Sequence, residues 1–272
     1  MECKEIFQGG ESMDQSISED ELIAVCGKVG KILLTSGAET SRVEGTVEYI
    51  GRAAHYDISC HATITALFVG VKNQTKTHLV KVRLGDFNLE KVDEINTMSR
   101  KFVTGQIDFA ELKRTIDQID KKVIDFTWPE KVFGAAMVSV APMLLFKATW
   151  ADLSLAFFVG IFGYLAAALS SPRIKTPYVA AGLGGFTVGF LAAVLQSLGI
   201  ATNAGNIIVS ALMPLVPGVA ITNSFREIID RNTISGVVRA VDALIIAGSI
   251  GAGVVLGVGL SGIIFHLIGG GL

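Results

Sequence analysis

The most constraining feature of this sequence is the unequal distribution of its charged residues. Residues 131–272 contain 7 Lys/Arg and 4 Asp/Glu in 142 positions, whereas residues 1–130 contain 16 and 21. So few charges cannot cover a water-soluble globule of that size. Long apolar stretches of this kind form helices in lipid, where about 20 residues cross the hydrocarbon core. The second half of the chain is therefore predicted to be an α-helical membrane domain.

The membrane domain, residues 131–272, is predicted to contain five transmembrane helices, at 132–146, 153–169, 179–198, 207–225 and 237–265. Basic residues gather at alternate ends of these stretches: Lys131; Arg173 and Lys175; then Arg226, Arg231 and Arg239. The opposite ends offer only Lys147 and Asp152, while Trp128 and Trp150 flank the first stretch as interfacial anchors. Because basic residues stay inside, the protein is predicted to be a multi-pass plasma-membrane protein with a cytoplasmic N-terminus and an external C-terminus.

The remaining chain is predicted to form a polar tail at residues 1–18 and a small cytoplasmic α+β domain at 19–130. The tail lacks the basic start and apolar run of a secretory signal. Apolar residues recur at helical spacing over 19–35, in a second stretch that includes Val43, Val47 and Ile50, and over 89–103 and 109–124. Ser36 and Glu39 have the spacing of a capping box, which predicts that the second helix begins there.

Two segments of this domain have the alternation of β-strands. Over residues 58–69, apolar side chains that include Ala66 and Phe68 alternate with a polar face carrying His61. Residues 73–76 look like a turn, and the alternation over 78–84 predicts a partner strand. The domain is therefore expected to contain one long strand paired with a shorter one.

Several function classes are disfavoured by what the sequence lacks. Cys3, Cys26 and Cys60 form neither a disulfide framework nor a zinc pattern, so no metal or other cofactor is expected. No dense basic cluster favours nucleic acid as a partner. The sequence has no GxSxG, HExxH or P-loop motif, and capping alone explains Ser36 and Glu39, so an enzyme is not expected.

The fourth apolar stretch is the most informative part of the membrane domain. Pro214 and Pro217 each remove a helical hydrogen bond, and Gly218 permits a bend, so the helix is predicted to break near mid-membrane before Asn223. Broken membrane helices present backbone groups to solutes in transporters. A structural kink without a solute role remains the alternative.

Charged and small residues of the other stretches allow two interpretations each. Asp242 is either paired with Arg239, three residues earlier on the same helical face, or handles protons. Asp152 is expected to be a solvated carboxylate at a helix start. The GxxxG pairs at 185/189 and 253/257 predict close helix packing within the bundle, or alternatively contact between copies in a homo-oligomer.

Two separated motifs carry a resemblance to a known family. Residues 36–44 read Ser-Gly-Ala-Glu-Thr-Ser-Arg-Val-Glu and precede the strand that contains Thr63, and Leu-Val-Pro-Gly at 215–218 is followed by Asn223, Asp230, Gly236 and Arg239. In this order the motifs resemble the threonine/serine exporter family. The resemblance marks these motif positions in the cytoplasmic domain: Ser36, Gly37, Glu39, Arg42, Glu44 and Thr63. His55 and Tyr56 stand where that pattern is expected to have glycine.

The chain is similar to the large, N-terminal-half subunit of the split two-component exporters of that family. The resemblance implies that a second, smaller membrane subunit supplies the remaining spans, and that the exported solute is threonine/serine or a dicarboxylate such as succinate. Without a nucleotide motif, the proton gradient is the expected energy source. The expected substrate path comprises Pro214, Pro217, Gly218, Asn223 and Asp230, and the expected proton-coupling residues are Asp242 and Arg239. The alternative is a membrane-anchored sensor or hydrolase-like enzyme that uses the cytoplasmic domain.

Overall fold

The computed structural model describes residues 17–83, 85, 87–122, 126–145, 148–171 and 176–269; for residues 268 and 269 it describes the backbone alone. The chain divides into two compact units. The N-terminal unit comprises Met1–Val123 and Arg226–Gly236, and the helical unit comprises Ile124–Phe225 and Val237–Leu272. Residues 226–236, which lie between the predicted fourth and fifth membrane stretches, therefore belong with the N-terminal unit.

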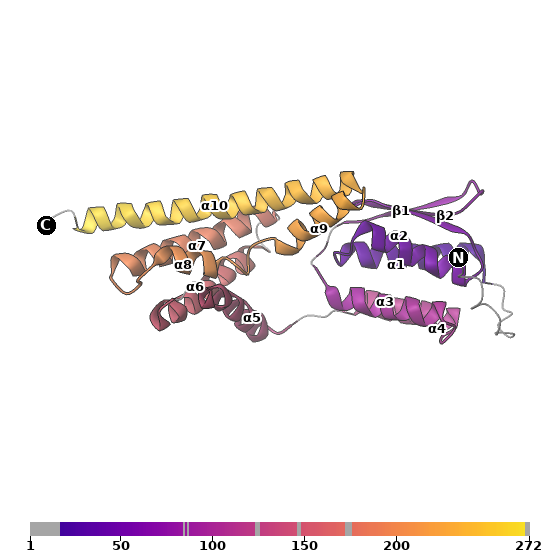
Figure 1. Ribbon diagram of the computed structural model, residues 1–272, viewed down its shortest axis with the longest axis horizontal. Coiled ribbons are helices and arrows are strands. Elements are labelled where there is room, and N and C mark those ends of the chain that lie inside the picture. Colours follow the sequence, from indigo (N-terminus) through magenta and orange to yellow (C-terminus); the bar gives the residue numbers. More distant parts are fainter. Residues whose placement is uncertain are drawn as a thin grey trace. The chain divides into compact units, whose positions relative to one another are not determined.

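In the described part of the N-terminal unit, helices α1 to α4 accompany an antiparallel sheet with the strand order β1-β2-β3 (Figure 1). Its elements are α1 (Glu19–Thr35), α2 (Thr40–Ala53), β1 (Ile58–Ala62), β2 (Ala66–Val71), β3 (Thr77–Lys81), α3 (Leu89–Val103) and α4 (Phe109–Lys121). Helices α1 and α2 cover one face of the sheet and α3 and α4 pack against them in turn. Leu22, Leu33, Ile50, Leu67 and Ile116 are fully buried between these layers.

Helices α1 and α3 have the bounds predicted from their apolar periodicity. The sequence prediction for the second helix start is wrong. Ser36 closes α1, and α2 begins at Thr40, with Glu39 at the N-cap position but no capping bond from its own side chain. Gly37, at φ +89°, turns the chain between the two helices, so Ser36 cannot reach the start of α2.

The prediction of a single strand over residues 58–69 is also wrong, because this segment forms the hairpin of β1 and β2. Thr63 closes a tight turn: its N–H and hydroxyl both donate to the Ala66 carbonyl, at 2.8 and 3.1 Å. The turn shifts the alternation, so that Leu67 is fully buried while Phe68 lies on the outer face opposite His61. His55 adopts φ +64°, the conformation in which the family pattern was expected to place glycine.

The helical unit contains α5 (Trp128–Val140), a 3₁₀ turn at Ala141–Leu144, α6 (Trp150–Ser170), α7 (Pro177–Ser197), α8 (Ala204–Ala211), the first part of α9 (Gly218–Ile229) and most of α10 (Thr233–Gly269). Within the described residues, α6, α7 and α10 are long and apolar enough to cross a membrane. In the most apolar windows of α6 and α10 only 22% of the residues are buried inside the chain, which leaves the rest for lipid.

The first and fourth predicted spans differ from single long helices. Helix α5 has 13 residues and passes into the 3₁₀ turn that contains Pro142. The fourth stretch is divided into α8 and α9, as the prolines predicted, and turns replace helix over residues 212–217. Leu215 at this break packs on α7, where a Cβ placed on Gly184 would lie 2.6 Å from the Leu215 Cδ1.

The glycine pairs bring α7 and α10 into backbone contact (Figure 1). A Cβ on Gly253 would lie 2.1 Å from the Gly182 carbonyl oxygen, and one on Gly189 would lie 2.6 Å from that of Val254. This confirms the prediction of close packing within the bundle. Residue numbers rise together along both helices, so α7 and α10 run parallel.

Candidate functional site

The first motif, residues 36–44, centres on the start of α2, which a distant segment of the chain caps. Residues Arg226–Gly236, here called the capping segment, belong to the N-terminal unit. The Arg226 guanidinium donates to the Glu39 carboxylate at 2.7 Å, and the Thr40 N–H donates to Glu227 Oε1 at 3.3 Å. Ser41 Oγ donates to Asp230 Oδ2 at 3.1 Å. Three consecutive motif residues therefore bind the capping segment.

Burial and charge explain why this contact is specific. The Glu227 side chain is fully buried and accepts from a free N–H of the first turn of α2, where the helix dipole favours negative charge. Glu39 raises the pKa of Arg226 through its hydrogen bond and its charge. The capping segment thus supplies the carboxylate that the predicted capping box was expected to supply locally.

The other motif residues have separate roles in the N-terminal unit. Glu44 Oε1 accepts from the Ala62 N–H at 2.8 Å and lies 3.2 Å from His61 Nδ1, so it joins α2 to β1. Thr63 forms the hairpin turn, and Arg42 is exposed. A Cβ on Gly37 would lie 2.1 Å from the Phe87 ring, so its position requires glycine. None of these contacts forms a nucleophile–base pair.

The predicted path residues fall into both units. Pro214, Pro217 and Gly218 form the break between α8 and α9, and Asn223 is buried in α9. Asp230 lies in the capping segment, where its carboxylate accepts a hydrogen bond from Ser41 of α2. The structure therefore groups Asp230 with the first motif, although the two positions are 189 residues apart.

The predicted proton-coupling residues lie near the start of α10. The Tyr178 hydroxyl of α7 donates to Asp242 Oδ1 at 2.6 Å, a contact that sequence spacing did not suggest. Arg239 is buried. The Tyr178 bond thus ties Asp242 to the neighbouring helix α7.

Asp152 differs from its predicted state. It was expected to be solvated, yet it is buried in the first turn of α6, and its Oδ1 accepts from the Thr202 N–H at 2.8 Å. Its own N–H is capped by Thr149 Oγ1 at 3.1 Å. The expectation failed because helix-start spacing cannot reveal that the loop before α8 folds over this end of α6.

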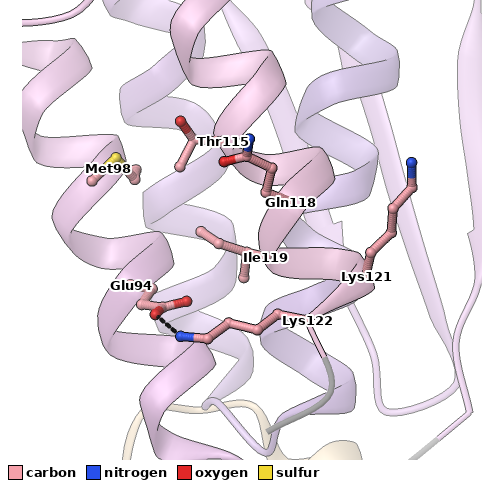
Figure 2. A pocket seen from close by; sticks show the side chains of 7 residues that line it. All are labelled: Glu94, Met98, Thr115, Gln118, Ile119, Lys121 and Lys122. Carbon is pink, nitrogen blue, oxygen red and sulfur yellow. Dashed lines mark hydrogen bonds and ion pairs between the residues drawn. The ribbon is translucent and has the colours of Figure 1, made fainter.

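A groove of about 610 Å³ lies between α3 and α4, away from every predicted site residue. It is lined by Glu94, Met98, Thr115, Gln118, Ile119, Lys121 and Lys122. Figure 2 shows the Lys122 amino group bonded to the Glu94 carboxylate along one edge. Across the described residues, no three His, Cys, Asp or Glu side chains gather to hold a metal ion.

Sequence reasoning missed Glu227 as a site residue. Its signal was a carboxylate directly after an apolar stretch, between Arg226 and Asp230, in a chain with only 4 acidic residues beyond position 130. A buried acid in such a position needs a partner. The spacing could not reveal that the partner is the start of α2.

Comparisons with known proteins point to the same family as the motifs at residues 36–44 and 215–218. The family model of the putative threonine/serine exporters matches residues 24–261. A threonine/serine exporter of Corynebacterium glutamicum is 25% identical over 256 residues, which are 90% of this chain and 52% of that protein. The pheromone-regulated membrane protein 10 of Candida albicans is 26% identical over 258 residues, 87% of this chain and 22% of that protein. No solved structure matches.

The fold defines a helical membrane protein, with α6, α7 and α10 long and apolar enough to cross a membrane among the described residues. The chain belongs to the threonine/serine exporter family. It spans about half the length of the Corynebacterium relative and about a fifth of the Candida relative.

Proposed function

We propose that this chain is the large subunit of a proton-coupled exporter of threonine/serine, which works with a smaller membrane subunit that supplies the other half. The break between α8 and α9 carries this proposal, because broken membrane helices present backbone groups to a polar solute. The residues that match this chain make up 52% of the Corynebacterium relative.

The proposed topology is five crossings, with the N-terminus cytoplasmic and the C-terminus external. The parallel contact of α7 and α10 supports it, because a chain that enters two neighbouring helices from the same side must return between them. The α8–α9 segment is the stretch available for that return. Lys131, Arg226, Arg231 and Arg239 favour the same orientation, whereas Lys147, Arg173 and Lys175 lie outside the described residues.

Asp242 is the proposed proton carrier, since a carboxylate in an apolar helix is costly unless it has a partner or a function. A dicarboxylate such as succinate is the second candidate solute. A membrane-anchored sensor or hydrolase-like enzyme is the alternative class; the absence of a nucleophile–base pair among the described motif contacts argues against it.

Reconstituted vesicles test this proposal. The chain purified together with its membrane partner should release labelled threonine under an imposed pH gradient, and the chain alone should not. A reporter that is active only in the cytoplasm should be inactive when it is fused after Leu272, because the C-terminus is expected to be external. The proposal fails if deletion of both subunits leaves solute efflux unchanged while a cytoplasmic reaction disappears.

A further inference from the structure

Asp152 is a buried carboxylate that has no role in the proposed transport function. It is 2% exposed and lies in the first turn of α6, inside a unit made almost entirely of apolar residues. The hydrogen bond that the structure gives its side chain comes from a neutral group, the Thr202 N–H, to Oδ1. Burial of a charge without a cation is expensive, so a residue of this kind is usually functional.

Within the described residues, the helices that contact α6 most extensively carry no cation near Asp152. They are α5, α7 and α8, and their titratable residues are Glu130, Lys131 and Tyr178, all in the first turns of α5 and α7. The Asp152 end of α6 lies beside the C-terminal ends of α5 and α7, because consecutive helices α5, α6 and α7 alternate in direction. Tyr164 lies 12 residues further along α6, about 18 Å away.

Two buried hydroxyl groups lie on helices that pack on α6, one of them beside the break between α8 and α9. Ser139 of α5 packs on Gly160 of α6, where a Cβ would lie 2.0 Å from the Ser139 Oγ and 3.8 Å from Ala211 Cα of α8. Ser210, next to Ala211, is fully buried, and its Oγ has no hydrogen-bond partner among the described residues. An unpartnered buried hydroxyl in an apolar bundle can accept an ordered water or a polar ligand.

We propose that Asp152 binds the ammonium group of the exported solute and thereby selects amino acids over dicarboxylates. This inference rests on the proposed export function and names the solute class. The Thr202 N–H orients the carboxylate through Oδ1 and leaves Oδ2 for an ammonium donor. A dicarboxylate would bring a second negative charge to the same buried place, which the low dielectric makes unfavourable.

Two substitutions separate charge from position. Asp152→Asn removes the charge but keeps an oxygen that can accept from Thr202, whereas Asp152→Ala removes both. The full chain with its membrane partner is purified in detergent, and binding of L-threonine is measured by calorimetry. Because a hydrogen bond to a charged group contributes about 1.5–3 kcal/mol, Asp152→Asn should bind threonine about 10- to 100-fold more weakly while melting as the wild type does.

Analogues tested on the wild type make the result independent of how the variants fold. 2,3-Dihydroxybutanoate, which lacks the ammonium group of threonine, and succinate should both bind at least about 10-fold more weakly. Lys147→Gln controls for a cation outside the described residues and should keep threonine binding. Equal binding of threonine and 2,3-dihydroxybutanoate, full binding by Asp152→Asn, or loss of binding in Lys147→Gln would overturn the inference. A wild-type complex that exports succinate but not threonine overturns it and keeps the exporter, and one that exports neither solute refutes the proposed function itself.

Discussion

The guanidinium of Arg226 donates a 2.7 Å hydrogen bond to the carboxylate of Glu39, 187 positions earlier in the chain. The bond ties the capping segment to the start of α2 within the N-terminal unit. Phe225 before the capping segment and Val237 after it belong to the helical unit. Three contacts, from Arg226, Glu227 and Asp230, therefore hold the capping segment at the start of α2.

Reversal of the Glu39–Arg226 pair should test this contact. Glu39→Arg and Arg226→Glu should each speed amide exchange in residues 226–236, and the double variant should restore slow exchange. The Arg226 side chain is 58% exposed, so the coupling free energy should be about 0.5–1 kcal/mol. Arg42→Glu, a change at an exposed arginine of the same motif, is the control. Equal exchange in the single and double variants would show that the pair does not hold the segment.

The backbone contact of α7 and α10 predicts a difference between two neighbouring glycines of α10. Gly253→Ala places a Cβ 2.1 Å from the Gly182 carbonyl oxygen, whereas a Cβ on Gly251 meets nothing within 4 Å. Gly253→Ala should therefore lower the free energy of unfolding by about 1–3 kcal/mol, and Gly251→Ala should change it by less than about 0.5. Thermal unfolding in detergent measures both. Equal melting temperatures would mean that the helices do not approach this closely.

Substitutions of Asp242 and of Tyr178 should distinguish a role in proton coupling from a role in the contact between α7 and α10. Asp242→Asn keeps an acceptor for the Tyr178 hydroxyl but cannot cycle a proton, so pH-driven efflux should vanish while passive exchange persists. Tyr178→Phe removes the 2.6 Å bond and keeps the carboxylate, so coupling should survive at a changed rate. Full gradient-driven efflux in Asp242→Asn would assign the proton route to the other subunit.

Pro217 should matter for transport rather than for insertion. It precedes α9, and Ala at this position adds the missing backbone donor and favours a continuous helix by about 3 kcal/mol. Pro217→Ala should therefore reduce efflux strongly while the amount of protein in the membrane stays constant. Pro177→Ala is the matched control, because Pro177 opens α7, where a missing N–H costs little. Wild-type efflux in Pro217→Ala would leave the break a structural kink.

The buried thiols predict a pH dependence of the N-terminal unit. Burial raises the pKa of Cys26 to about 12 and raises that of Cys60, to which the Glu44 charge adds. In the unfolded chain a cysteine thiol has a pKa of about 8.5. The contribution of each buried thiol to the free energy of unfolding is therefore fully present below that pH. It declines as pH rises toward 12, by up to about 1.4 kcal/mol per pH unit. In a Cys3→Ser background, iodoacetamide at pH 9 should label neither thiol until the protein is unfolded.

Ser59→Cys provides the control for this measurement, because position 59 lies between buried Ile58 and Cys60 in β1 but faces outward. Its thiol should react in the folded protein at the rate of a free cysteine. Rapid native labelling of Cys26 or Cys60 would contradict the burial of these thiols.

Local signals were sufficient for much of the fold. The bounds of α1 and α3 follow from apolar spacing together with Ser18 and Asn88, whose side chains accept the N–H groups of Glu21 and Lys91 in the first turns. The break before Gly218 follows from two prolines, which lack the donor that a helix needs. The few charges beyond residue 130 indicated a membrane domain because transfer of apolar side chains from water requires no partner of defined geometry.

Contacts between distant positions were decided only by the tertiary structure. The N-terminus of α2 is capped by Glu227, Asp242 is bonded to Tyr178, and Asp152 is covered by the loop that contains Thr202. Each of these contacts depends on where whole helices lie, whereas spacing along one element reports only which face a residue occupies. The sequence by itself determined which segments are helical and which are apolar; the tertiary structure decided which charge meets which partner, because directional bonds form only after the helices that carry them have packed.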